Sequence, residues 1–319
     1  MATAIRYAGY GVTLLSFYYI GRIAAESSLA LPRFTARTGA TIAAVCVAYA
    51  AFPFVSAWTW KLSVELVSGR RMGFGEAFGV YVTTNIGKYL PGNVMQYVGR
   101  NYVGARHGWP HSQLALGSIV EVVAIVAVPF LILVALHLAN LWTLPTAFPL
   151  AAGRLPDATT LAVAAAIAAI LVLALWSRLT GIVTAIGELT RRGRARALAA
   201  RAGAFVVKVA LLSAAGLVGT TALFYALATT LPEAGFRAAD FFNIGCALTI
   251  AGYAGILTPG VPGGIGVKES ASVILLSAYG YDQASLVMLA LLARVCSMAG
   301  DVIAFLVAVR FGRRAGDGG

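Results

Sequence analysis

The sequence predicts an all-α membrane protein with about six spanning helices and two re-entrant or short-helix hairpins arranged as an inverted repeat. Only 11% of the 319 residues are charged and the mean hydropathy is +0.83, whereas a soluble domain carries about 25% charged residues. Several uncharged stretches reach the ~20 residues that cross a bilayer. Two motifs rich in proline and glycine interrupt this apolar sequence and resemble each other. We expect residues 1–319 to form a single polytopic membrane domain.

Six apolar segments are predicted to span the membrane, at residues 7–25, 38–60, 112–141, 158–177, 209–231 and 283–309. Lysine and arginine accumulate in cytoplasmic loops of membrane proteins. Alternating sides along the chain brings together the basic loop at 61–71, a loop with six arginines between 178 and 201, and the basic tail after 309. This pattern predicts a multi-pass protein of the cell membrane with cytoplasmic N- and C-termini. The loop with Arg33 and Arg37 is the exception, because it falls on the outside.

The two motifs are YLPGNVMQYVGR at residues 89–100 and TPGVPGGIGVKES at residues 258–270. The first proline and the basic residue nine positions later repeat with the same offset of 168 residues (259 − 91 and 268 − 100). Non-helical backbone at membrane depth survives only where protein covers it or water reaches it. We therefore predict two hinges, formed by Pro91, Gly92, Pro259, Gly260, Pro262, Gly263 and Gly264.

The hinges divide two hairpin regions, residues 74–106 and 241–280. Each half of the first region is too short to cross the ~30 Å hydrocarbon core. Three spans separate the two regions, so they enter from opposite faces, as in inverted repeats. We assign repeat halves of about 38–141 and 203–310 and expect the hinges to meet near the middle of the membrane.

Charges inside apolar helices need a partner or a function, because burying one costs about 3 kcal/mol on insertion scales. Glu121 and Arg294 lie at similar depths in the two halves. They are predicted either to form a structural ion pair or to form a pair that opens during transport. Asp301 lies on the same helix face as Arg294 and is expected to compete for it.

The basic residues near the hinges are candidate anion ligands. Lys268 and Glu269 follow the glycines where a second half-helix begins, and the start of a helix favours negative charge. Arg100 occupies the equivalent place in the first half, and Lys88 precedes the break. For Lys88 and Arg100, the alternative is that their side chains extend to the cytoplasmic headgroups.

Other classes of site lack a motif. A formal net charge of +12 is a feature of many nucleic-acid-binding proteins. No basic face with interleaved aromatic residues is present, so nucleic-acid binding is not predicted. Cys46, Cys246 and Cys296 stand apart in apolar helices, and no histidine has metal-ligand spacing, so no metal or disulfide is predicted. No cofactor motif or catalytic motif is apparent, and we expect no enzymatic activity.

With these residues placed, the chain resembles the lysylphosphatidylglycerol synthase transmembrane-region family, also called the flippase-like domain family. The resemblance rests on KYLPG with Arg100, the glutamate at 121, PGGIGVKE at 262–269 and Arg294. It implies an inner-membrane protein that moves a lipid or a lipid-linked headgroup between leaflets. Synthase members also carry a soluble aminoacyl-transferase domain, and we expect this chain to be a stand-alone member. Val122 follows the glutamate of the third span, where many relatives have a basic residue.

The predicted function is therefore a lipid flippase or lipid transporter, whose partner is a membrane lipid. The residues predicted to bind the lipid headgroup are Lys88, Arg100, Glu121, Lys268, Glu269, Arg294 and Asp301. The alternatives are a membrane-embedded transferase or accessory protein for a polyprenyl-linked substrate, with Glu269 or Asp301 as base, and a small-solute secondary transporter. The sequence leaves open the lipid, the energy coupling and whether the chain forms a homo-oligomer.

Overall fold

The computed structural model describes residues 14–23, 25, 35–90, 94–143, 194–231, 235–258 and 261–316. These residues form helices and connecting turns without a β-strand. The predicted all-α membrane fold is confirmed. The elements are α2 (Ala36–Tyr49), α3 (Phe52–Ser68), α4 (Phe74–Asn85), η1 (Ile86–Tyr89), α5 (Met95–Arg106), α6 (His111–Leu138), α8 (Arg194–Ala228), η3 (Ala238–Asp240), α9 (Phe241–Leu257), η4 (Pro262–Gly264), α10 (Val267–Ser277) and α11 (Gln283–Gly316).

Within the described residues, five helical segments are long and apolar enough to cross a membrane: Ala36–Ser68, His111–Leu138, Arg201–Ala228, Ala238–Ile256 and Gln283–Arg310. Four of these segments match predicted spans. The remaining segment, Ala238–Ile256, contains α9 and falls in the second hairpin region. The predicted span at 158–177 lies outside the described residues, and of the predicted first span only residues 14–23 and 25 are described.

The predicted span at 38–60 is broken into two helices. α2 ends at Tyr49 and α3 begins at Phe52, with Pro53 in the first turn of α3. Proline has no backbone N–H to donate to the preceding turn, so a helix readily restarts at this position. The apolar helix then continues to Ser68, past the predicted boundary, because Lys61 forms a 2.8 Å ion pair with Glu65 one turn later.

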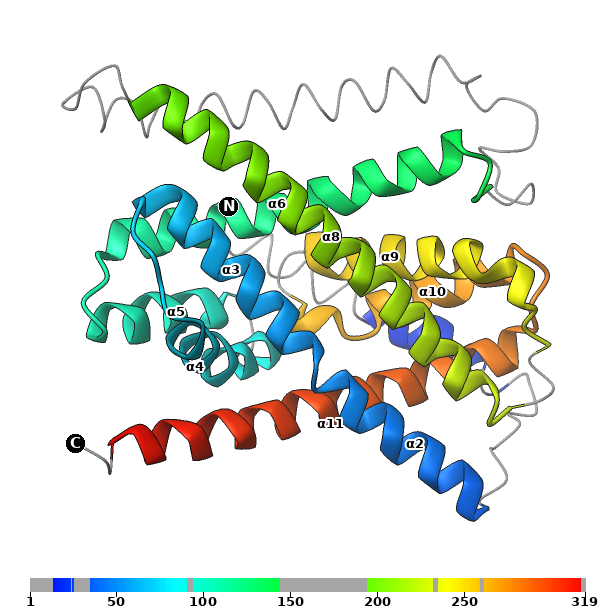
Figure 1. Ribbon diagram of the computed structural model, residues 1–319. Helices are drawn as coiled ribbons and strands as arrows, with labels where there is room; N and C mark the ends of the chain where they lie inside the picture. The colour runs from blue at the N-terminus through cyan, green and yellow to red at the C-terminus, as the bar shows by residue number, and fades with distance from the viewer. Residues whose placement is uncertain are drawn as a thin grey trace.

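Two helix pairs enter the molecule from opposite ends. The pair α4 and α5 lies at the left of Figure 1, and the pair α9 and α10 lies at the right, while α6, α8 and α11 run between the two ends. α4 and α5 have 12 residues each and α10 has 11. At 1.5 Å per residue these helices reach only ~16 to 18 Å, well short of a ~30 Å core.

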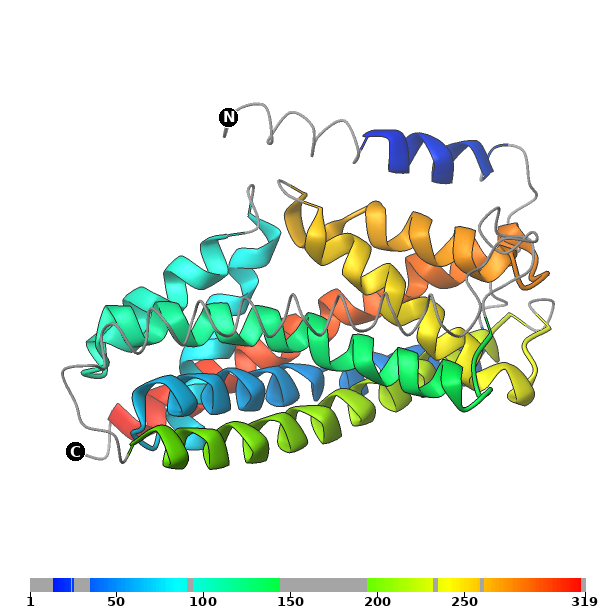
Figure 2. The same cartoon turned by 90° about the horizontal axis from the view of Figure 1, so that it is seen from above.

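The inner ends of the two pairs meet in the middle of the protein. η1, at the end of α4, contacts η4, which precedes α10, and the view from above shows both inner ends at the centre (Figure 2). Of the predicted hinge residues, Pro262, Gly263 and Gly264 form η4. The other four, Pro91, Gly92, Pro259 and Gly260, lie outside the described residues.

Two glycines are required for these close approaches. Gly264 has a φ of +66°, and a Cβ there would lie 2.8 Å from the Cα of Gly255 in α9. Gly117 lets α6 cross α3 closely, because a Cβ at this position would lie 2.6 Å from Val64 Cγ2 and 2.9 Å from Val64 Cα. The backbone of α3 cannot move away from such a contact without disturbing the core around Val64, which is fully buried.

We predict that Gly117→Ala destabilises the protein by about 1 to 3 kcal/mol, the usual cost of overpacking a core. Gly216→Ala is the matched control, because it also lies in a helix but its Cβ would contact nothing within 4 Å. Alanine should raise helix stability there by up to about 1 kcal/mol. Thermal unfolding of the two detergent-solubilised variants measures the difference. Equal melting temperatures would contradict the close α3–α6 crossing.

Candidate functional site

The seven charged residues predicted to bind a headgroup gather into three ion pairs and one lysine without a pair. Each pair joins the inner part of a hairpin to a long helix: Arg100–Glu121, Lys88–Asp301 and Arg294–Glu269. Lys268 has no hydrogen bond or ion pair among the described residues. Four cations and three carboxylates therefore leave one excess positive charge in this part of the protein.

The Arg100–Glu121 pair is tightly enclosed between α5 and α6. Arg100 Nη1 lies 2.5 Å from Glu121 Oε2, and only 2% and 3% of the two side chains are exposed. The guanidinium carbon of Arg100 lies 3.7 Å from the centre of the Tyr81 ring, which provides a further favourable contact for the cation. This pair has the geometry of a fixed helix–helix contact.

The predicted pair between Glu121 and Arg294 is wrong. Glu121 bonds to Arg100 within the first half, and Arg294 lies beside Glu269 within the second half. The physical reason is local packing, since the second helix of each hairpin packs on the long helix that follows it, α5 on α6 and α10 on α11. In the first contact the arginine is on the hairpin helix α5 and the glutamate is on α6. In the second contact the glutamate is on the hairpin helix α10 and the arginine is on α11.

The Glu269–Arg294 pair is looser than its counterpart. Arg294 Nη1 lies 3.5 Å from Glu269 Oε1 and donates instead to the Gly263 carbonyl at 3.0 Å. Glu269 Oε2 accepts a 2.7 Å bond from the Gly266 N–H, so this carboxylate caps the start of α10. Two buried nitrogens of Arg294, Nε and Nη2, have no hydrogen-bond partner among the described residues.

Asp301 lies at a junction between the first hairpin and α11. Its Oδ2 accepts from Lys88 Nζ at 2.6 Å and from the Tyr89 hydroxyl at 2.5 Å, and its Oδ1 accepts from Asn85 Nδ2 at 3.2 Å. The expectation that Asp301 competes for Arg294 is therefore wrong. These three donors come from the end of α4 and from η1, which lie closer to Asp301 than Arg294 does.

Tyr89 is a central residue that sequence reasoning missed. Its hydroxyl bonds Asp301, its ring centre lies 5.7 Å from the guanidinium carbon of Arg294, and a Cβ on Gly263 would lie 3.3 Å from its Cδ1. It thus contacts both hairpins and α11. Its place two residues before the proline of the first proline-glycine break was the available signal.

Lys268 and Arg294 line a small cavity between α2, α8, α9, α10 and α11. Its volume is about 40 Å³, and its polar lining includes Tyr49, Thr220, Lys268, Glu269, Ser272, Arg294 and Ser297. A water needs about 10 to 15 Å³ of such volume, so the cavity has room for a few waters and not for a lipid headgroup. Tyr49, Thr220 and the two serines were not predicted, because single hydroxyls in apolar helices give no distinctive pattern.

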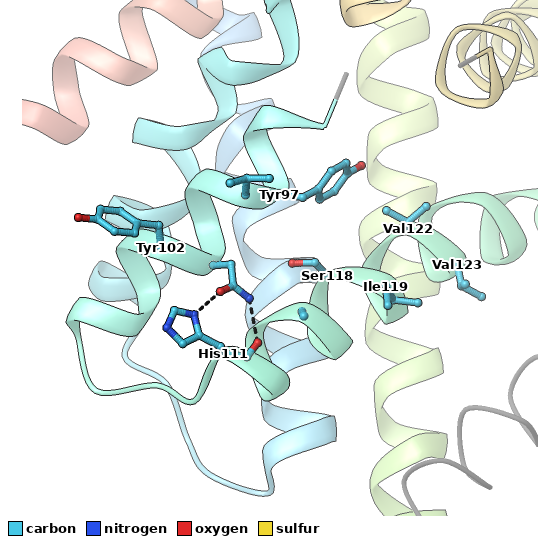
Figure 3. Close-up of a pocket in the computed structure, with 10 residues that line it drawn as sticks. Tyr97, Tyr102, His111, Ser118, Ile119, Val122 and Val123 are labelled. Carbon is cyan, nitrogen blue, oxygen red and sulfur yellow. Dashed lines mark hydrogen bonds between the residues drawn. The ribbon is translucent and has the colours of Figure 1, made fainter. Parts of the chain in front are cut away.

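A much larger groove lies between α5 and α6. Its volume is about 710 Å³ and its lining is almost entirely apolar, with Val98, Ile119, Val122 and Val123 among the lining residues. In Figure 3, Tyr97 points toward Val122, while Tyr102 and His111 lie toward the opposite end. At that end Asn101 donates a 2.8 Å hydrogen bond to the His111 carbonyl. Tyr97 separates the groove from Arg100, whose guanidinium carbon lies 5.2 Å from its ring centre.

These features define a polytopic α-helical membrane protein with a charge-rich centre, where the inner ends of two short hairpins meet. Among the described residues, no three metal-ligating side chains gather into a cluster. A comparison with protein-family models matches residues 11–304 to the lysylphosphatidylglycerol synthase TM region. The chain belongs to this family, as its motifs predicted. A search of curated proteins found no match.

We predict that breaking the buried pair in the first half destabilises the protein strongly. Arg100→Met or Glu121→Leu alone should cost about 3 to 5 kcal/mol, because each leaves a buried charge without a partner. The double variant should recover most of that loss, since it removes both charges. Arg237→Met is a control, because the Arg237 side chain is 74% exposed beside Asp240. Thermal unfolding in detergent measures the four variants, and a double variant less stable than both single variants would contradict the pairing.

Proposed function

We propose that the protein moves a lipid with an anionic or zwitterionic headgroup between the leaflets of a membrane. The observation that carries the proposal is the arrangement at the second hairpin, where Lys268 and Arg294 line one cavity. Among the described residues, Lys268 has no ion pair and two buried nitrogens of Arg294 have no hydrogen-bond partner. Ammonium and guanidinium donors without partners are suited to bind phosphate oxygens. Membership of a family named for a lipid synthase supports a lipid as the ligand.

In the proposed mechanism, Glu269 occupies the phosphate position in the absence of lipid. It caps α10 and lies 3.5 Å from Arg294, which is longer than a typical charge-assisted hydrogen bond. An incoming phosphate would displace Glu269 from Arg294 while Glu269 keeps its bond to the Gly266 N–H. This exchange replaces one anion by another and leaves no buried cation uncompensated.

The cavity of about 40 Å³ must widen to admit a headgroup. We infer that it opens alternately to the two sides as the hairpins move against the long helices. The short hairpins are proposed to be re-entrant and to form an inverted repeat, which is the geometry in which opposite faces can open in turn. The inner ends meet through Tyr89 and Gly263, which supports a shared gate at this point.

The acyl chains are proposed to stay outside this polar site. The apolar groove between α5 and α6 offers one surface for them, and its 710 Å³ lies within the ~300 to 1,000 Å³ typical of ligand pockets. We further propose an inner-membrane location with both termini in the cytoplasm. The interchanged pairs Arg100–Glu121 and Glu269–Arg294 support the assignment of two related halves.

Transport is proposed in preference to catalysis. Both carboxylates considered as catalytic bases are engaged: Glu269 caps α10, and Asp301 accepts hydrogen bonds from three donors. These contacts occupy carboxylate oxygens that a catalytic base would have to turn toward a substrate.

We predict that vesicles containing the purified protein exchange fluorescent phosphatidylglycerol between leaflets faster than protein-free vesicles. Lys268→Ala and Arg294→Ala should each lower that rate at least about tenfold, which corresponds to losing one charge-assisted contact to phosphate. Lys208→Ala is the matched control, because Lys208 is exposed on α8. Bleaching of outer-leaflet fluorescence by dithionite measures the rate.

Two results would contradict the proposed function. One is exchange that Lys268→Ala and Arg294→Ala leave unchanged. The other is the absence of lipid exchange together with a new covalent product from a lipid-linked donor, which would favour a transferase.

A further inference from the structure

The apolar groove between α5 and α6 has one polar end, at the turn that joins the two helices. Its lining extends from Val123, within α6, to Tyr102 and His111 beside the turn (Figure 3). Val98 on α5 and Ile119 on α6 line the groove and are exposed among the described residues. The small cavity of the proposed headgroup site lies between other helices, namely α2, α8, α9, α10 and α11. The groove is therefore a separate surface of the protein.

The length of the groove matches the depth of one leaflet. Along α6 its lining runs from His111 to Val123, which are 12 residues apart (123 − 111). At 1.5 Å per residue this separation is ~18 Å, and half of a ~30 Å hydrocarbon core is ~15 Å. The acyl chain of a phospholipid spans one leaflet. An acyl chain in the groove would therefore extend from the helix turn to about the middle of the bilayer, with its headgroup at the turn.

The polar end of the groove carries two arginines. Arg106 ends α5, and its guanidinium carbon lies 5.9 Å from the ring centre of Tyr102, which lines the groove. The guanidinium carbon of Arg70 lies 4.7 Å from the ring centre of Trp109, within the turn. Both arginines are exposed, and neither forms an ion pair among the described residues. Glu76 is the nearby carboxylate, and it accepts a 2.6 Å bond from Trp109 Nε1. The groove thus ends at a surface with excess positive charge.

We propose that a phospholipid with a net negative headgroup docks at this groove, with one acyl chain between α5 and α6 and its phosphate beside Arg106 and Arg70. The proposed orientation of the protein puts this lipid in the cytoplasmic leaflet. A guanidinium group can bind two phosphate oxygens at once, and each basic residue near a membrane surface strengthens the attraction of anionic lipid by about fivefold. The inference goes beyond the proposed function, because it holds whether or not the lipid crosses the membrane.

The charges favour a lipid over a second copy of this chain as the occupant. A second copy would have to bring a carboxylate to Arg106 and Arg70. Among the described residues the one exposed carboxylate is that of Asp282, which directly precedes α11. In Figure 1, α11 begins at the right, whereas the turn between α5 and α6 is at the left. Two copies inserted in the same orientation cannot bring these opposite ends together, while an anionic lipid supplies its charge at the right depth.

The test uses two photoactivatable lipids, phosphatidylglycerol and phosphatidylcholine, that carry the same diazirine-bearing acyl chain. The purified full chain is reconstituted in phosphatidylcholine vesicles that contain one probe, and after irradiation mass spectrometry locates the adducts. Leu211 is the internal reference, because it is exposed on α8 and does not line the groove. The ratio of phosphatidylglycerol to phosphatidylcholine adducts at Val98 and Ile119 should exceed the ratio at Leu211 by at least about fivefold.

Two changes, each with a matched control, test the two ends of the groove. The double variant Arg70→Gln/Arg106→Gln should lower the groove ratio to the value at the reference position. Arg237→Gln should leave it unchanged, because Arg237 is also exposed but lies in the loop between α8 and α9. Ile119→Trp should fill the groove and lower the labelling of α5 by both probes, whereas Leu211→Trp on α8 should not.

Three results would overturn the proposal. One is an equal adduct ratio at the groove and at Leu211 in the wild type, and another is a groove ratio that the double arginine variant leaves unchanged. The third is the absence of adducts at Val98 and Ile119 while Leu211 is labelled, because protein, such as a second copy of the chain, then covers the groove. If size-exclusion chromatography shows that the double variant is misfolded, the comparison of Ile119→Trp with Leu211→Trp decides. Labelling measures binding and not exchange between leaflets, so these results leave the proposed function standing.

Discussion

The structure depends on the requirement that charged groups in a low-dielectric interior have partners. Seven charged side chains gather where the inner ends of the two hairpins meet, and six of them satisfy the requirement as three pairs. The pairs differ in closeness, from the enclosed Arg100–Glu121 contact at 2.5 Å to the Arg294–Glu269 contact at 3.5 Å. The seventh group, Lys268, is a cation without a partner among the described residues. Lys268 is half-buried, and removing its charge from water is costly unless an anion reaches it. A membrane contains many phosphate-bearing lipids.

The two halves of the molecule use the same contact for different purposes. In each half, the second helix of a hairpin is joined to the next long helix by an arginine and a glutamate, with the two residue types interchanged. In the first half, Tyr81 packs against Arg100 of the enclosed pair, and one buried nitrogen of Arg100, Nε, has no hydrogen-bond partner among the described residues. The second half leaves nitrogens of Arg294 unbonded beside a cavity. The first contact is therefore closely enclosed, whereas the second lies beside a cavity.

Much of this fold could be predicted from the sequence. The length of the apolar stretches predicts the long helices, and proline and glycine predict where the short ones end. The charged residues were recognised because each is rare in such sequence. Their pairing was not predictable, because position along a helix gives depth in the membrane but not the neighbour that the side chain faces. Glu121 and Arg294 are predicted to lie at a similar depth, yet Glu121 pairs with Arg100 and Arg294 lies beside Glu269. The break at residues 50–51 and the role of Tyr89 were missed because neither interrupts the apolar pattern.

The most direct test of the central claim is native mass spectrometry of the purified protein, released from detergent with its bound lipids. If the charge of Lys268 is compensated by a lipid phosphate, the wild-type protein retains a phosphate-bearing lipid that Lys268→Met loses, while Lys208→Met retains it. Equal lipid retention by Lys268→Met and the wild type would contradict the account.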